Sequence, residues 1–268
     1  MNGSRPILMN KTKTFHELHH RDEPLVLPNA WDFGSGAALA AEGFPAIGTT
    51  SLGVAVAAGL PDGTGVTRDE TLAVATRLAR LSVPVTVDIE GGFSEDPGAV
   101  ADYVAQLAEL GIAGVNLEDG RPESALAEPG HQAELIAAIK ARTPELFVNA
   151  RVDTYWLKLQ RDSTLARVEQ YTNAGADGIF VPGMTDPVEI TGLVAATALP
   201  VNILYAAQGP SIATLAELGV RRISTGSLLY RTALAAIVDA ARAVRDDGPF
   251  TIEVPTYGEV QAITAAGW

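Results

Sequence analysis

Eight short apolar segments, rich in β-branched residues, recur along the chain and alternate with alanine- and leucine-rich stretches of helical period. Most of these segments are apolar on both faces, which is typical of strands buried in a parallel sheet between helices. The predicted strands are Leu25–Trp31, Ala46–Ser51, Val83–Ile89, Gly114–Asp119, Leu146–Asp153, Gly178–Pro182, Val201–Tyr205 and Arg222–Thr225.

The stretches between these strands carry helix start and stop signals. Thr67 and Glu70 have the spacing of a capping box, and Asp96-Pro97 and Asp186-Pro187 each place a cap residue before a first-turn proline. Glycines follow the predicted helix ends and precede the next strand within a few residues, at Gly111, Gly175 and Gly219.

Eight strand–helix units favour a (β/α)₈ barrel of the TIM type as one domain over residues 1–268. Residues 1–24 are expected to be a helical lead-in and residues 246–268 a C-terminal extension. The alternative is a doubly wound open sheet. That fold would carry a G-x-G-x-x-G turn after the first strand, and the residues from Pro28 to Asp32 are not one.

Composition narrows the function classes. The chain has 268 residues, 47% of them hydrophobic, and no cysteine, which excludes disulfides, a thiolate nucleophile and cysteine-ligated metals. Its 19 Lys and Arg against 32 Asp and Glu give a net charge of −13, which argues against a nucleic-acid partner. Residues 1–24 lack a signal-peptide pattern and Val54–Leu60 is too short to span a bilayer, so we expect a cytoplasmic protein with no membrane partner.

Polar residues gather where the predicted strands end, which is where barrels of this class build their active sites. Asp88 and Glu90 follow the third strand, Glu118 and Asp119 the fourth, and Asp62 lies in the loop after the second. Converging carboxylates repel one another unless a cation intervenes, and an all-oxygen set is what Mg²⁺ prefers. Some of these acids could instead cap helices or pair with arginines. Trp31 and Asn202 also lie at strand ends and are candidates for substrate contact.

Arg151 lies within the fifth predicted strand, where an unpaired guanidinium would be costly to bury. It therefore needs a bidentate partner, either a carboxylate of a neighbouring strand or the anionic group of a substrate.

Other chemistries are disfavoured. His16-Glu17-Leu18-His19-His20 satisfies H-E-x-x-H, but it precedes the first strand and is soon followed by Pro24, so we expect an exposed N-terminal helix and no zinc. No lysine lies at an inner strand end to form a Schiff base, and neither pyridoxal phosphate nor a nucleotide cofactor is expected. Ser227, which opens the last helix, could hold a phosphate.

Five segments in order resemble the isocitrate lyase/phosphoenolpyruvate mutase superfamily over about Leu25 to Leu234: LPNAWD, TTSLGVAVAAGLPDG, VPVTVDIEGGF, GVNLEDG and NARVDT. The resemblance implies a modified (β/α)₈ barrel whose last helix is exchanged between subunits of a homodimer or homotetramer. It also implies Mg²⁺, or Mn²⁺ in its place, and small 2-oxo carboxylic acids as substrates.

The same resemblance assigns roles to residues. Asp88 resembles the direct metal ligand, and Asp62, Glu90 and Glu118 resemble the acids that hold the water molecules of the metal. The loop of Thr50, Ser51 and Leu52 resembles the one that grips the substrate carboxylate, and Arg151 resembles the arginine that clamps the substrate anion.

One loop departs from the family pattern. Lyases of the superfamily carry K-[KR]-C-G-H after the fourth strand, whereas this chain has Ala127-Glu128-Pro129-Gly130-His131, with Pro129 at the cysteine position. Candidates for the acid or base that replaces the cysteine are Glu128, His131, Tyr205 or a metal-bound water molecule.

Three functions follow. The first is a Mg²⁺-dependent lyase that cleaves or decarboxylates a small 2-oxo or 2-hydroxy acid through a metal-stabilised enolate, with Arg151 and Glu118 in the catalytic set. The second is a P–C bond enzyme of the phosphonopyruvate hydrolase or phosphoenolpyruvate mutase type. The third is a protein that binds 2-oxo acids without efficient turnover.

Overall fold

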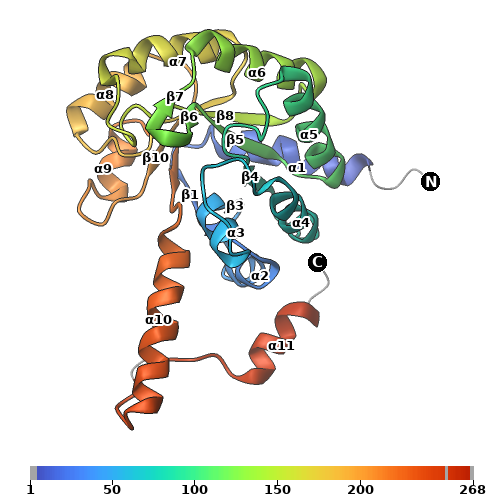
Figure 1. Cartoon of the computed structure of the whole chain (residues 1–268), viewed down its shortest axis with the longest axis vertical. Coiled ribbons are helices and arrows are strands. Elements are labelled where there is room, and N and C mark those ends of the chain that lie inside the picture. Colours follow the sequence, from blue (N-terminus) through green and yellow to red (C-terminus); the bar gives the residue numbers. More distant parts are fainter. Residues whose placement is uncertain (1–4, 251–252, 266–268) are drawn as a thin grey trace.

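The computed structural model describes residues 5–250 and 253–265, and parallel strands form one sheet that closes into a barrel with helices around it (Figure 1). Its order is β1-β11-β10-β9-β8-β5-β4-β3-β2. The strands are β1 (Leu25–Leu27), β2 (Asn29–Ala30), β3 (Ile47–Thr49), β4 (Val85–Asp88), β5 (Gly114–Glu118), β8 (Phe147–Arg151), β9 (Gly178–Phe180), β10 (Val201–Leu204) and β11 (Arg222–Ser224). Every predicted strand contains one of these and the first contains two, which confirms the predicted barrel.

The barrel closes at the first predicted strand, which Pro28 divides. β1 pairs with β11 and β2 pairs with β3, so the two short segments together join the last strand to the second. The side chain of Asn29 strengthens this junction. Its Oδ1 accepts from the backbone N–H groups of Thr225 (3.0 Å) and Gly226 (2.8 Å), and its Nδ2 donates to the carbonyl of Thr49 (2.7 Å). One side chain therefore links the ends of β11 and β3 where backbone pairing is interrupted.

Helices follow most of the strands and bury their apolar faces against the sheet. They are α2 (Phe33–Ala41), α3 (Ser51–Ala57), α4 (Arg68–Leu78), α5 (Pro97–Leu110), α6 (Pro129–Arg142), α7 (Thr164–Asn173), α8 (Pro187–Ala195) and α9 (Ile212–Glu217). The predicted caps of α5 and α8 are confirmed, because the Asp96 and Asp186 carboxylates accept from first-turn N–H groups. The predicted capping box at Thr67 is wrong: its hydroxyl donates to Glu90 rather than to the start of α4.

The N-terminal helix α1 (Arg5–Leu18) covers the end of the barrel at which the strands begin. Phe15, Leu18 and His19 are buried there, and the His19 ring stacks on Phe147 at 4.2 Å between centroids. The expectation of an exposed helix is therefore wrong for this face. The Nδ1 atom of His19 lies 2.7 Å from the carbonyl oxygen of Phe15, so the histidine serves packing between α1 and the sheet.

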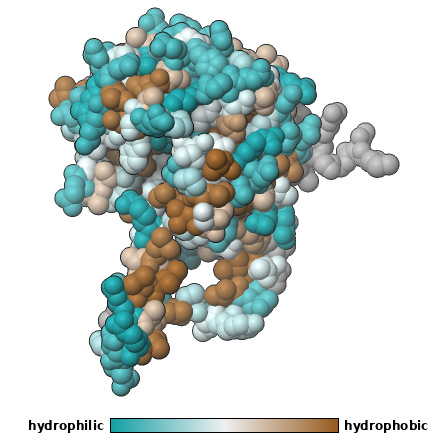
Figure 2. Space-filling model, in the orientation of Figure 1, coloured by the Kyte–Doolittle hydropathy of each residue, from teal (hydrophilic) through white to brown (hydrophobic). Residues whose placement is uncertain are grey.

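The last helices leave the barrel. α10 (Leu228–Arg245) projects away from it, and α11 (Tyr257–Ala265) turns back towards α2 (Figure 1). Apolar side chains are exposed along α10 at Leu234, Ile237, Val238 and Val244, and Figure 2 shows hydrophobic surface on this helix. We call these four residues the α10 stripe. Ile237 and Val238 follow Leu234 by three and four positions, and Val244 follows Ile237 by seven, so all four lie on one face of the helix.

Among the described residues, no helix is both long and apolar enough to cross a membrane.

Candidate active site

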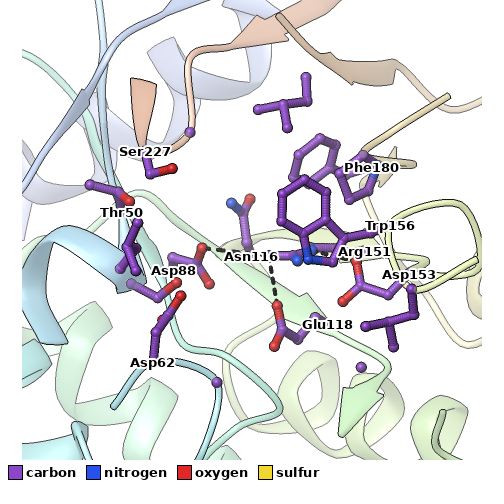
Figure 3. A pocket seen from close by; sticks show the side chains of 18 of the residues that line it. Thr50, Asp62, Asp88, Asn116, Glu118, Arg151, Asp153, Trp156, Phe180 and Ser227 are labelled. Carbon is purple, nitrogen blue, oxygen red and sulfur yellow. Dashed lines mark hydrogen bonds and ion pairs between the residues drawn. The ribbon is translucent and has the colours of Figure 1, made fainter. Parts of the chain in front are cut away.

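A cavity of about 370 Å³ opens at the carboxyl ends of the strands. Figure 3 shows Thr50, Asp62 and Asp88 on one side of it and Phe180 and Trp156 on the other, with Arg151 between. The structure thus brings together most of the residues that the sequence marks as a site. Of the predicted site residues, the cavity is lined by Thr50, Ser51, Leu52, Asp62, Asp88, Glu118 and Arg151.

Asp88 and Glu118 are the central acids of this cavity. Burial raises the pKa of Asp88 to about 6, with the Asp62 charge adding to the shift and Arg151 opposing it. Burial likewise raises the pKa of Glu118 to about 8, although Arg151 opposes that shift too. Both carboxylates therefore hold protons more tightly than they would in water, mainly because burial disfavours their charged forms and secondarily because neighbouring acids repel them.

Arg151 is held from two sides. Its Nη1 lies 2.6 Å from Glu118 Oε2 and 4.0 Å from Asp88 Oδ2, and its Nε donates to Asp153 Oδ1 at 2.7 Å. The predicted need for a carboxylate partner is met within the protein, and the guanidinium also lies 5.8 Å from the ring centroid of Phe180. Asp153 lies in the turn that follows β8, and it orients Arg151 from the side opposite Asp88 and Glu118.

The acids fit a hard divalent cation. Among the described residues, no three His, Asp or Glu side chains lie close enough together to bind one ion directly. A site with one direct carboxylate and further acids acting through water, as Mg²⁺ commonly has, matches this spacing. Asp88 lies between Asp62 and Arg151, so its carboxylate could hold such an ion with Asp62 close by.

Glu90 and Asp119, also predicted to converge here, do not line the cavity. The Glu90 carboxylate accepts from the backbone N–H of Gly65 at 2.8 Å and from the hydroxyl of Thr67. It therefore orders the loop that carries Asp62 and does not line the cavity. Its backbone has a φ of 49°, in the left-handed region that is costly for residues other than glycine.

Asp119 points away from the cavity. It is fully buried and accepts from Arg167 Nη1 (3.0 Å), the Tyr171 hydroxyl (2.8 Å) and the backbone N–H of Asp153 (2.8 Å). The expectation that it belongs to the acid cluster is wrong. Arg167 Nη1 also donates to the carbonyl of Ala127 at 2.9 Å, so this network fixes the chain on both sides of the loop after β5.

Five other candidates do not line the cavity, namely Trp31, Glu128, His131, Asn202 and Tyr205. Trp31 packs edge-on against Tyr230, with 5.1 Å between ring centroids, and Asn202 lies beneath the floor, where its Oδ1 accepts from Ser224. Glu128 is exposed at the start of α6, and His131 Nε2 lies 2.9 Å from Glu95. The loop that precedes them forms a hairpin of β6 (Gly120–Arg121) and β7 (Ala125–Leu126), joined by the short helix η1 (Pro122–Ser124).

Several lining residues were not identified from the sequence. Asn116 on β5 is a polar residue among apolar neighbours, and this break in the apolar pattern is the sequence signal that marks it. Five further lining residues form an apolar wall, and in the sequence they look like core residues: Trp156, Leu157, Phe180, Pro182 and Leu204.

Comparison with known proteins identifies the family. The family model described as phosphoenolpyruvate phosphomutase matches residues 15–245. The uncharacterized protein Rv1998c of Mycobacterium tuberculosis is 52% identical over 251 residues, covering 93% of this chain and 95% of that protein. Oxaloacetate decarboxylase of Ectopseudomonas mendocina is 31% identical over 205 residues, covering 71% of this chain and 69% of that enzyme.

Solved structures agree. A candidate lyase/mutase from Burkholderia cenocepacia J2315 has a TM-score of 0.89 and 35% identity, over 97% of this chain and 98% of that one. Relatives and structural neighbours include an oxaloacetate decarboxylase and a 2,3-dimethylmalate lyase. The chain therefore belongs to the phosphoenolpyruvate phosphomutase family, within the isocitrate lyase/phosphoenolpyruvate mutase superfamily of enzymes.

Proposed function

We propose that this chain is a Mg²⁺-dependent lyase that acts on a small 2-oxo or 2-hydroxy carboxylic acid and breaks a carbon–carbon bond, by cleavage or by decarboxylation. One observation carries the proposal: Asp62, Asp88 and Glu118 share a cavity with Arg151. A divalent cation and a guanidinium together suit a ligand with adjacent carboxylate and 2-oxo oxygens.

Asp88 would hold the metal directly, and Asp62 and Glu118 would hold its water molecules, with Mn²⁺ able to replace Mg²⁺. Glu90 supports this arrangement through the loop that carries Asp62. When bound, the ion would act as a Lewis acid on the oxygens of the substrate.

The chain supplies two anion-binding groups of its own. Ser51 begins α3, so the N–H groups of Ser51 and Leu52 belong to the first helical turn and have no carbonyl partner within the helix. We assign to them, with the Thr50 hydroxyl, the carboxylate of the substrate. Arg151 faces the negative charge that develops on the substrate when the bond breaks, and Glu118 and Asp153 hold it in place for that task.

The loop after β5 indicates which type of reaction the site can catalyse. Pro129 forms the first residue of α6 and offers no proton, in the position where superfamily lyases carry cysteine. Decarboxylation and retro-aldol cleavage need less proton transfer than isocitrate cleavage, so we favour them. The 31% identity to oxaloacetate decarboxylases supports the same choice.

The apolar wall bears on the substrate. Phe180 and Trp156 face the acids across the cavity, and Leu204 also lines it; we take this apolar surface to favour a substrate with an alkyl group over one with a phosphonate. Superfamily members of similar fold include 2,3-dimethylmalate lyase, 25% identical, and a phosphonopyruvate hydrolase solved with oxalate and Mg²⁺, 22% identical.

A substrate panel tests the proposal. Oxaloacetate, 2,3-dimethylmalate and phosphonopyruvate are each incubated with the protein and Mg²⁺, with EDTA in a parallel series, and pyruvate and phosphate are followed. Asp88→Ala controls for metal-promoted decarboxylation in solution. Pyruvate from a carbon substrate, abolished by EDTA and by the variant, is the expected result. Phosphate release would favour the P–C bond enzyme, and binding without any product would favour a non-catalytic 2-oxo acid binder.

We also propose that the protein is a homodimer or homotetramer in which α10 packs on a neighbouring subunit. The α10 stripe supports this proposal, because an isolated helix with one apolar face is stabilised by packing that face against another surface.

A further inference from the structure

A buried arginine lies beneath the floor of the cavity. Arg222 on β11 is fully buried, and it forms no ion pair with any carboxylate in the described part of the chain. Burial lowers its pKa to about 9, with the charge of Asp88 opposing the shift. Burying a guanidinium without a direct counter-ion is unfavourable. The buried guanidinium of Arg222 therefore destabilises the fold, and this suggests a role for it beyond packing.

The guanidinium spans the barrel from β11 to β5, which are four places apart in the strand order. Its Nε donates to Ser224 Oγ at 3.1 Å and its Nη2 donates to Asn116 Oδ1 at 3.2 Å. Both Ser224 and Asn116 line the cavity, so Arg222 is one hydrogen bond away from whatever the cavity holds.

Arg222 determines how the Asn116 amide is oriented. An arginine can only donate hydrogen bonds, so the atom of Asn116 that meets it must be the oxygen. The same oxygen accepts from Asn149 Nδ2 at 2.9 Å. With its oxygen turned to two donors, Asn116 directs its Nδ2 elsewhere, and within the described residues no hydrogen bond uses that nitrogen.

The position of Asn116 places this N–H donor, unpaired among the described residues, within the cavity. Asn116 is the register partner of Asp88 on the neighbouring strand, and it lies two residues before Glu118 on the same face of β5. In Figure 3 it stands between Asp88 and Arg151, at the centre of the cavity. Its amide is neutral, so its N–H can donate to a substrate oxygen between Asp88 and Arg151 without adding charge to the site.

We infer that Asn116 is a substrate-binding residue whose amide N–H donates to an oxygen of the 2-oxo acid, and that Arg222 is a positioning residue that holds this amide in the donating orientation. The inference rests on the proposed function of the site. Removing a donor that faces developing negative charge lowers kcat by about 100-fold to 1,000-fold in comparable sites.

Asn116→Asp is the sharpest test. An aspartate keeps the shape of the side chain and still accepts from Arg222 and Asn149, but it presents a second oxygen to the substrate where the wild type presents N–H. Urea unfolding checks that the variant is folded, because the new carboxylate gains Arg222 as a counter-ion but also lies beside Asp88 and Glu118. We expect kcat to fall by about 100-fold or more, and oxalate binding in the presence of Mg²⁺, measured by calorimetry, to weaken by a similar factor.

Arg222→Met and the double variant Asn116→Ala/Arg222→Met test the positioning role. If Arg222 acts through Asn116, the double variant should bind oxalate no more weakly than Asn116→Ala alone, since the orientation of a missing amide cannot matter. If the double variant instead loses oxalate affinity by the product of the two single-variant factors, the positioning role of Arg222 is overturned. Thr86→Val is the matched control: its hydroxyl is buried in the same interior without a hydrogen-bond partner among the described residues, and we expect wild-type binding.

The outcomes separate this inference from the proposed function. Wild-type protein that binds oxalate but turns over no substrate would contradict the lyase and leave the binding comparison valid. Asn116→Asp protein that binds oxalate within threefold of wild type would overturn the role of Asn116. If Arg222→Met does not fold, Arg222→Lys replaces it in the comparison of the single and double variants.

Discussion

Glu118 and Arg151 are register partners on the neighbouring strands β5 and β8, and their side chains meet at 2.6 Å on the cavity side of the sheet. The pair places a cation and an acid at the same depth in the barrel, with Asp88 4.0 Å from the guanidinium. A parallel sheet in this register brings opposite charges together without help from loops, and it makes the pair part of the barrel wall as well as part of the site.

Arg151→Met should therefore affect both stability and activity. The substitution leaves Glu118 and Asp153 buried without their cation, which costs about 3–5 kcal/mol in the free energy of unfolding for comparable buried pairs. Urea unfolding of the metal-free protein measures this loss. Arg142→Met removes an exposed pair with Asp102 and should change stability by less than about 1 kcal/mol. Equal effects of the two substitutions would contradict the account of the buried pair.

Proton and metal binding should compete at the acids. The folded pKa values of Asp88 (about 6, from 3.8) and Glu118 (about 8, from 4.5) are raised, so the folded protein binds protons more tightly than the unfolded chain. The metal-free protein should lose stability as pH rises from about 4 to about 8. Because Mg²⁺ must displace the proton of Asp88, its affinity should fall about tenfold per pH unit below pH 6.

Thermal unfolding with and without Mg²⁺ between pH 5 and pH 8.5 measures this competition. We expect Mg²⁺ to raise the Tm more at pH 8 than at pH 5. An equal rise at both values would mean that the ion does not bind at these carboxylates.

Gly120→Ala should disturb the support of Arg151. A methyl group at Gly120 would overlap the carboxylate of Asp153, which holds Arg151 Nε. We expect kcat/KM to fall by about tenfold or more, as misplacement of a positioned group does elsewhere. Gly192→Ala is the control, because its methyl group would meet no atom within 4 Å and alanine favours the helix. Wild-type kinetics for Gly120→Ala would show that Asp153 is not needed to orient Arg151.

The α10 stripe should control assembly. Ile237→Glu places a charge in the middle of the stripe, at a side chain that is 64% exposed in the single chain. If α10 packs on another subunit, burying that charge is unfavourable, and light scattering should show a smaller species than the wild type. Asp239→Ala, on the opposite side of the same helix, should leave the mass unchanged. A wild-type protein that is already monomeric would contradict the proposed assembly.

The sequence predicted the site best for residues whose position in space follows from the order of the strands. The residues that end β4, β5 and β8 had to meet at one rim of a parallel barrel, so Asp88, Glu118 and Arg151 could be assigned to one site. Strand alternation also indicates direction: Asp119 adjoins Glu118 and therefore faces the opposite side of the sheet, so this pattern excludes it from the acid cluster. The pattern does not indicate how far a side chain reaches.

Hydrogen-bond partners distant in the sequence were also beyond prediction. Arg222 follows Arg221 and begins a short strand, and its sequence neighbours do not reveal that its side chain crosses the barrel to Asn116. Thr67 has the spacing of a cap but bonds to Glu90 instead, because a buried carboxylate competes for its hydroxyl. The apolar wall reads as ordinary core because Phe180 and Leu204 continue the pattern of buried strands.

The central claim is that this cavity binds a divalent cation at Asp88 and uses it to break a carbon–carbon bond. Calorimetric titration of Mg²⁺ into the wild type and into Asp88→Ala, paired with pyruvate formation from oxaloacetate and 2,3-dimethylmalate, tests it most directly. The account predicts Mg²⁺ binding and pyruvate formation by the wild type and neither by the variant. Unchanged Mg²⁺ affinity in Asp88→Ala, or pyruvate formation that persists in EDTA, would contradict it.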